Sequence, residues 1–304
     1  MSASADSERG PTGNGRAVFW LIVTTFLWGG SFVFNKIGLR EVSPILFMTV
    51  RFALAALVLG AVAGARLRAL TQDAISRGIL IGLALAAANL TFVFGVSGTT
   101  VSRAGFLNNL FVLIIPLFCF LFWKSRIDRF TLAGVGLAAL GLAQLAWGAA
   151  GGFSRGDLFS TVCAFFISLH ILAVSRLLRQ GEILAVTWVQ LVTVAICGSG
   201  LLLVVPQPPS HFSMAALGAL AYCVVFPTVI CFSLQNTFQR YVTPTQAGLI
   251  YTLDPIWSLL GGMLILGERL TPREWLGCAL IFAAVVLPLA GNWLAERHAP
   301  QGGS

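Results

Sequence analysis

A single carboxylate, Asp254, lies in the long apolar run AGLIYTLDPIWSLLGGMLILG at residues 247–267. An acid among apolar residues is costly unless a cation or a proton neutralises it, so this residue is a candidate binding group. Pro255 follows it, and proline lacks an N–H and disfavours helix at the preceding residue. The run therefore predicts either a carboxylate that binds a proton or an amine, or one that accepts hydrogen bonds from a kinked backbone.

Two stretches place polar and aromatic residues on one helical face, because residues three and four apart face the same way. They contribute Trp28, Ser31, Phe32 and Asn35, and Tyr251, Asp254 and Ser258. Further polar residues deep inside apolar runs are Asn89, Asn108, Asn109 and His170. At such depth an amide or imidazole either bonds to a neighbouring helix or contacts a ligand, and the sequence leaves both roles open.

Tryptophans fall into two groups by depth. Six lie near the ends of apolar runs, as is typical of a membrane interface, whereas Trp28 and Trp257 lie deeper and are expected to line a cavity. The complete set of expected substrate-binding residues is Trp28, Ser31, Phe32, Asn35, Asn89, Asn108, His170, Tyr251, Asp254, Trp257 and Ser258.

Metal and cofactor chemistry find no support in the sequence. The three histidines are scattered, and none of the six cysteines forms a CxxC pair. The glycines of GVGLAALG at residues 134–141 follow no strand, so they predict close helix packing instead of a phosphate loop. We expect no metal, no cofactor and no catalytic set.

Composition identifies the elements that must position these residues. The chain has 304 residues, of which 57% are hydrophobic and only 10% are charged, and its mean hydropathy is +0.88. A soluble domain usually carries about 25% charged residues, so the sequence predicts an all-α polytopic membrane protein. The ten expected spans are 17–37, 44–64, 78–97, 102–122, 130–149, 157–175, 184–205, 213–235, 244–267 and 273–294.

The net charge of +8 does not indicate nucleic-acid binding, because of where the cations lie. With the N-terminus inside, twelve lysines and arginines fall on the inner side and five on the outer side. This positive-inside bias places both termini in the cytoplasm. We expect the membrane to be a plasma membrane, the inner membrane of a bacterium. Arg51 lies inside a span at a depth from which it can reach Asp254, so an ion pair between them stays open.

An internal repeat divides the chain. At an offset of 143 residues SRAGFL (102–107) falls on TQAGLI (245–250), and Gly134 falls on Gly277. The sequence thus predicts a tail at 1–16, five-helix repeats at 17–149 and 150–294, and a tail at 295–304. Because five is odd, the second repeat must be inverted, a design in which the binding site lies at the midplane between the repeats.

Three stretches resemble the EamA-type family of the drug/metabolite transporter superfamily. They are FLWGGSFVFNKIGL (26–39), TVRFALAALVL (49–59) and LDPIWSLLGGMLILGERLTPREWLGCALI (253–281), and the resemblance extends over about residues 17–294. It implies ten helices in two inverted five-helix repeats, a central cavity, and export of amino acids or related metabolites.

A secondary transporter of small organic solutes is therefore the expected function, with the lipid bilayer as its surroundings. A polytopic membrane enzyme and a passive channel are the alternatives, although neither a clustered catalytic set nor a ring of charges is visible. The solute, the direction of flux, coupling to a proton and assembly into a homodimer stay open.

Overall fold

A computed structural model describes residues 11–99, 101–125, 127–146, 153–266 and 271–298, which form helices and no strand. Three short helical turns join some of the α-helices: η1 (Gly64–Ala69), η2 (Val225–Ile230) and η3 (Gln239–Tyr241). The α-helices are α1 (Pro11–Gly38), α2 (Pro44–Ala63), α3 (Gln72–Gly98), α4 (Val101–Asn108), α5 (Phe111–Trp123), α6 (Arg129–Ala146), α7 (Arg155–Leu177), α8 (Ile183–Val204), α9 (Met214–Val224), α10 (Cys231–Phe238), α11 (Pro244–Tyr251), α12 (Asp254–Leu266) and α13 (Pro272–His298).

Several helices begin at residues that cap their free backbone N–H groups. The hydroxyl of Thr71 accepts from the N–H of Ala74 at the start of α3. Ser154 and Asp157 form a reciprocal capping box at the start of α7, and Thr243 and Gln246 form another at α11. Polar residues between apolar runs thus set the helix boundaries.

The outer surface is apolar, as a bilayer requires. Large side chains such as Leu57, Phe122, Leu203 and Met214 are exposed. Among the described residues eight helical segments are long and apolar enough to cross a membrane, and α6 is apolar but shorter. The remaining expected span, 244–267, is divided between α11 and α12. The all-helical prediction is confirmed, while the count of ten spans stays a prediction.

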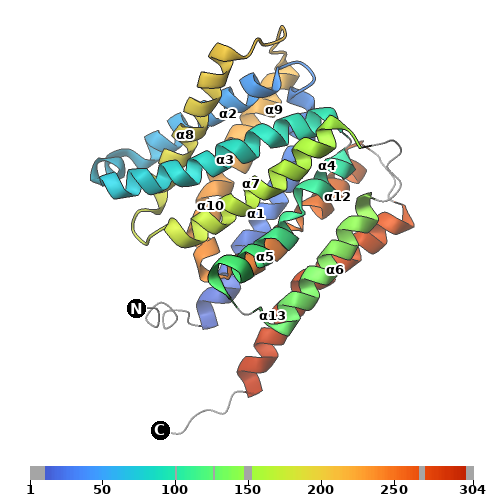
Figure 1. Cartoon of the computed structure of the whole chain (residues 1–304). Helices are drawn as coiled ribbons and strands as arrows, with labels where there is room; N and C mark the ends of the chain where they lie inside the picture. Colours follow the sequence, from blue (N-terminus) through green and yellow to red (C-terminus); the bar gives the residue numbers. More distant parts are fainter. Residues whose placement is uncertain (1–10, 100, 126, 147–152, 267–270, 299–304) are drawn as a thin grey trace.

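Helix α1 packs against α9, α10, α11 and α12, and α3 packs between α7 and α8. Helices α6 and α13 lie side by side at one flank of the bundle (Figure 1). They run antiparallel, because Gly134 lies against Ala284 and Gly141 lies against Gly277. Figure 1 also shows the first turns of α1 and the last turns of α13 at the same end of the bundle.

Two spans are interrupted in their middle at equivalent places. The first break lies at Asn109–Leu110, between α4 and α5, and the second break lies at Thr252–Leu253, between α11 and α12. The N–H of Asn109 bonds to the carbonyls of Gly105 and Phe106, and the N–H of Thr252 bonds to those of Gly248 and Leu249. Every residue in the second set is 143 positions after its counterpart, which is the offset of the internal repeat.

The structure differs from the sequence-based predictions at the start of α1 and at Tyr251 and Asp254, and it does not describe the side chains of two of the predicted interface tryptophans. Helix α1 begins at Pro11, inside the segment predicted as a tail. Because of the second break, Tyr251 ends one helix and Asp254 begins the next, so they do not share the face of one continuous helix. Trp147 and the side chain of Trp293, predicted at an interface, lie outside the described part of the chain.

Candidate functional site

A cavity lies in the middle of the bundle, between residues from the two halves of the chain. Its volume is about 130 Å³. A water takes about 30 Å³ in the liquid, and a cavity of about 150 Å³ can hold benzene, so this cavity has room for on the order of four waters or for a small organic solute. It is lined by Trp28, Ser31, Phe32, Arg51, Leu85, Ala88, Asn89, Phe92, Asn108, Asn109, Phe111, Cys163, Ile167, His170, Ile171, Phe232, Gln235, Tyr251 and Asp254.

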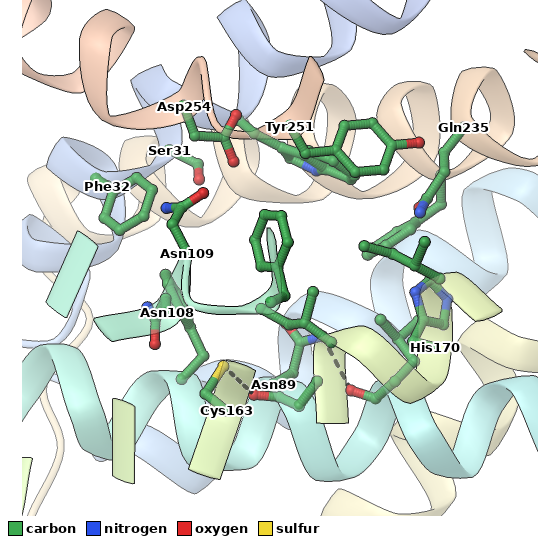
Figure 2. Close-up of a pocket in the computed structure, with 18 of the residues that line it drawn as sticks. Ser31, Phe32, Asn89, Asn108, Asn109, Cys163, His170, Gln235, Tyr251 and Asp254 are labelled. Carbon is green, nitrogen blue, oxygen red and sulfur yellow. Dashed lines mark hydrogen bonds between the residues drawn. The ribbon is translucent and has the colours of Figure 1, made fainter. Parts of the chain in front are cut away.

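The second break brings Asp254 to the cavity. Pro255 has no N–H to offer the carbonyl of Tyr251, so the α-helical hydrogen bond at this point cannot form. Asp254 is consequently the first residue of α12, and its side chain points into the cavity toward Ser31 and Asn109 (Figure 2). A helix N-terminus carries partial positive charge, which favours a carboxylate there.

Asp254 is not neutralised by any residue that the structure describes. Its Oδ1 atom is buried without a hydrogen bond. Within the described part of the chain, no lysine, arginine or histidine forms an ion pair with it. A buried polar atom without a hydrogen bond is unusual and costs about 1–3 kcal/mol. Asp254 Oδ1 is therefore an acceptor that no described residue satisfies.

The first break adds amide groups to the same side of the cavity. The Nδ2 of Asn109 donates to the carbonyl of Gly105 at 2.8 Å, which leaves its Oδ1 buried without a partner. Neither polar atom of the Asn108 side chain has a hydrogen bond. Asp254 Oδ1 and Asn109 Oδ1 are both acceptors, and together they suit a group that donates several hydrogen bonds.

Arg51 does not pair with Asp254, although the sequence leaves that pair open. Its Nε donates to the Thr228 hydroxyl at 2.6 Å, and its Nη1 donates to Asn35 Oδ1 at 3.4 Å. Thr228 belongs to η2, a π-helical turn that contains Pro227. Arg51 thus connects α2 to η2 and to α1.

A hydrogen-bonded polar cluster closes another side of the cavity. The Tyr251 hydroxyl donates to Gln239 Oε1 at 3.0 Å, and Gln235 Nε2 donates to the same atom at 2.9 Å. Gln239 Nε2 in turn donates to the carbonyl of Ile171 and to the Ser175 hydroxyl, both at 2.7 Å. We call Gln235, Gln239, Tyr251 and Ser175 the glutamine cluster; it joins α7, α10, η3 and α11.

His170 lies beside this cluster (Figure 2). Its Nε2 is buried without a hydrogen bond, and its ring meets the ring of Phe232 edge to face at 5.9 Å. It is available to a ligand in the cavity.

Eight of the eleven expected site residues line the cavity: Trp28, Ser31, Phe32, Asn89, Asn108, His170, Tyr251 and Asp254. The other three lie at neighbouring contacts. Asn35 is fully buried and bonded to Arg51. The indole N–H of Trp257 donates to Thr25 at 2.9 Å, and Ser258 lies on the same side, against Gly29 of α1.

Several lining residues were not expected from the sequence. Gln235 is the last residue of its expected span, next to Asn236 and Thr237. The aromatic wall includes Phe92, Phe111 and Phe232. The repeat offset was the one available signal for Gln235, because it places this residue opposite Phe92.

No group of three or more histidine, cysteine, aspartate or glutamate side chains that could hold a metal ion occurs where the structure describes the chain.

Comparison with known proteins gives consistent matches. The model of the EamA-like transporter family matches residues 15–147 and again residues 154–289. An "Uncharacterized transporter" of Archaeoglobus fulgidus is 28% identical over 88% of this chain and 83% of its own length. A "Probable amino-acid metabolite efflux pump" of Escherichia coli K12 is 23% identical over 93% of this chain and 97% of its own.

A solved crystal structure shares the fold. It superposes with a TM-score of 0.75 over 93% of this chain and 99% of its own length, at 19% sequence identity.

Proposed function

The chain belongs to the EamA-like transporter family, and we propose that it is a secondary transporter that exports amino acids or related metabolites by alternating access through the central cavity. It is a multi-pass integral membrane protein, and membership of a transporter family sets aside the membrane enzyme. The finer assignment, to solutes that carry an ammonium group, rests on the site and on the name of one relative.

The observation that carries the proposal is the unpartnered carboxylate at the second break. Asp254 Oδ1 and Asn109 Oδ1 are orphaned acceptors on one side of the cavity. An ammonium group offers three donors and a positive charge, so it satisfies both atoms and neutralises the acid. A broken helix at the middle of a span is also where secondary transporters bind their solutes.

We propose further that residues 17–149 and 150–294 form two five-helix repeats of opposite orientation, which together make ten spans. The equivalent breaks support this, as does the crossing of α6 and α13. Gly134 and Gly277 are related by the offset of 143, and so are Gly141 and Ala284. The contacts Gly134–Ala284 and Gly141–Gly277 are therefore two copies of one contact in an antiparallel pair.

The proposed topology has both termini in the cytoplasm and Thr271, at the start of α13, outside. A Thr271→Cys variant in intact cells should then react with a maleimide that cannot cross the membrane. Reaction only after the membrane is opened would contradict the inverted arrangement.

The transport proposal is tested by counterflow in proteoliposomes made with the purified protein. Labelled amino acids outside should accumulate transiently when unlabelled solute is loaded inside, a behaviour that a passive channel does not give. Asp254→Asn keeps the shape of the side chain but removes its charge, and we expect it to lower exchange at least tenfold. Ser258→Ala is the matched control, because Ser258 is on the same helix but outside the cavity.

A second role for Asp254, as a proton carrier, gives a different result in the same assay. Asp254→Asn would then retain counterflow and lose only the accumulation driven by a pH gradient. If a folded Asp254→Asn variant loses both counterflow and pH-driven accumulation, Asp254 binds the ammonium group. If the variant retains both activities, Asp254 is not part of the site.

A further inference from the structure

Arg51 is a buried cation that lines the cavity and forms no ion pair with a described acid. It is 5% exposed, and none of the ion pairs formed by the described residues includes it. Its Nε and Nη1 atoms have neutral partners, while Nη2 has no hydrogen bond to any residue that the structure describes. A buried charge with only neutral partners is costly, which indicates that an anion completes this position.

The guanidinium group is held in a fixed position. The Thr228 hydroxyl that accepts from Arg51 Nε donates to the carbonyl of Cys223 at 2.7 Å. Asn35 Oδ1 accepts from Nη1, and Asn35 Nδ2 donates to the carbonyl of Ser31 at 2.8 Å. Both supporting side chains use their donors on the backbone, so each presents an acceptor to Arg51. A guanidinium held this way keeps donors free for a planar carboxylate.

Arg51 and Asp254 line the same cavity but are not bonded to each other. Arg51 donates to Thr228, and Asp254 Oδ1 has no hydrogen bond. We propose that Arg51 binds the carboxylate of a zwitterionic solute whose ammonium group is bound by Asp254. This inference rests on the transport function proposed above and narrows its solute class. A solute with only an ammonium group leaves Arg51 unsatisfied, and one with only a carboxylate leaves Asp254 unsatisfied, so both are rejected.

The rest of the lining fits an apolar side chain. Six aromatic residues face the cavity, together with Leu85, Ile167 and Ile171. With a volume of about 130 Å³ the cavity suits only a small solute. A neutral α-amino acid with an aliphatic side chain meets both requirements.

Three probes that share the isobutyl side chain of leucine separate the two charges. Leucine carries both, isopentylamine carries only the ammonium group, and 4-methylpentanoate carries only the carboxylate. Competition with labelled leucine in the counterflow assay should show that the wild-type protein prefers leucine to each of the other two at least tenfold. A wild-type protein that binds isopentylamine as well as leucine overturns the inference.

The Arg51→Gln variant assigns the preference to one residue. It should lose most of the preference for leucine over isopentylamine, since the amine no longer meets an unpaired cation, while Arg51→Lys keeps part of it. Equal weakening of leucine and isopentylamine by Arg51→Gln would mean that Arg51 only connects α1, α2 and η2, and would overturn the proposal. If the glutamine variant does not fold, the wild-type competition and Arg51→Lys still decide.

The two levels of proposal fail differently. A protein that exchanges other solutes but none of the three probes is a transporter without the zwitterion site. A protein that exchanges no solute of any class overturns the transport function itself.

Discussion

The first and second breaks have the same backbone geometry and different side chains. In both, one N–H bonds to two carbonyls of the preceding turn, beginning with a glycine, Gly105 in the first and Gly248 in the second. At the first break α4 ends at Asn108, Asn109 lies in the break, and α5 begins at Phe111. At the second break α11 ends at Tyr251, Thr252 lies in the break, and α12 begins at Asp254.

The backbone interruption is shared by the two repeats, whereas the polar side chains beside it differ. The interruption itself occurs in both halves, so it belongs to the repeated architecture. The acid occurs only in the second half, and the orphaned amides occur at the first. The two similar breaks therefore contribute different groups to one side of the cavity, an acid from the second break and neutral acceptors from the first.

The largest expected effect comes from moving the charge between the breaks. Asn109 lies beside Asp254 in the cavity (Figure 2). If the carboxylate is needed only as a charge, the double variant Asp254→Asn with Asn109→Asp should exchange leucine at least three times faster than Asp254→Asn alone. Counterflow measures this. A double variant less active than Asp254→Asn would show that the acid has to be at the second break.

The next effect concerns the glutamine cluster beside the second break. Gln239→Leu removes the acceptor of Tyr251 and Gln235 and leaves buried groups unsatisfied, which should lower the free energy of unfolding by about 1–3 kcal/mol. The midpoint of thermal unfolding in detergent reports the loss. Gln72→Leu, at an exposed glutamine, should change it by no more than about 0.5 kcal/mol. Equal effects would mean that the cluster contributes no stability.

A smaller effect compares the caps of α6 and α13, at equivalent positions 128 and 271. Asp128 accepts from the N–H groups of Phe130 and Thr131, whereas Thr271 caps together with Glu274. Partial burial opposes ionisation of Asp128, but the hydrogen bonds from Thr131 and Phe130 outweigh it and lower the pKa below the usual 3.8. A lowered pKa in the folded state stabilises the protein above pH 3.8, and this stabilisation is lost as the pH falls through the folded value.

Asp128→Ala should therefore cost about 1 kcal/mol at neutral pH and less near pH 3. Asp128→Asn, which caps without a charge, should retain most of the stability at both. Unfolding midpoints at the two pH values test this, and a cost for the alanine variant that does not fall in acid would exclude a titrating cap.

The smallest effect compares the two glycines. A Cβ on Gly105 meets no atom within 4 Å, whereas one on Gly248 would approach Ile115 Cδ1 at 2.9 Å. Gly105→Ala should raise the free energy of unfolding by about 0.5–1 kcal/mol through helix propensity. Gly248→Ala should lose that gain, because Ile115 is buried and has to move. If both alanines stabilise equally, the second break is as loosely packed as the first.

The sequence predicted much of the fold because apolar length and charge are one-dimensional signals. Helix positions follow the apolar runs, the offset of 143 relates the two breaks, and the family resemblance is confirmed. The kink that the sequence offered at Pro255 corresponds to the second break, whereas the first break was not predicted. Only Pro255 gave a local sign, and the first break has no proline beside it.

For the site residues, the depth of a side chain along its span was easier to predict than whether the side chain points into the cavity. Counting along a run places Trp28 and Trp257 near mid-span, but only Trp28 lines the cavity. The second break resets the rotation of α12, and Trp257 turns toward Thr25 of α1. Whether any lining residue binds solute stays a prediction that transport assays have to test.

The separation of Arg51 from Asp254 has a kinetic consequence. Under the proposed alternating access the carrier returns empty after releasing its solute, and the empty form would then take two uncompensated charges through an occluded state. The loaded form makes the same passage with both charges neutralised. Solute outside the liposome should therefore accelerate the return of the carrier. One-for-one exchange across the liposome membrane should then be faster than net efflux. The ratio of the two rates should fall toward one in a variant that lacks both charges.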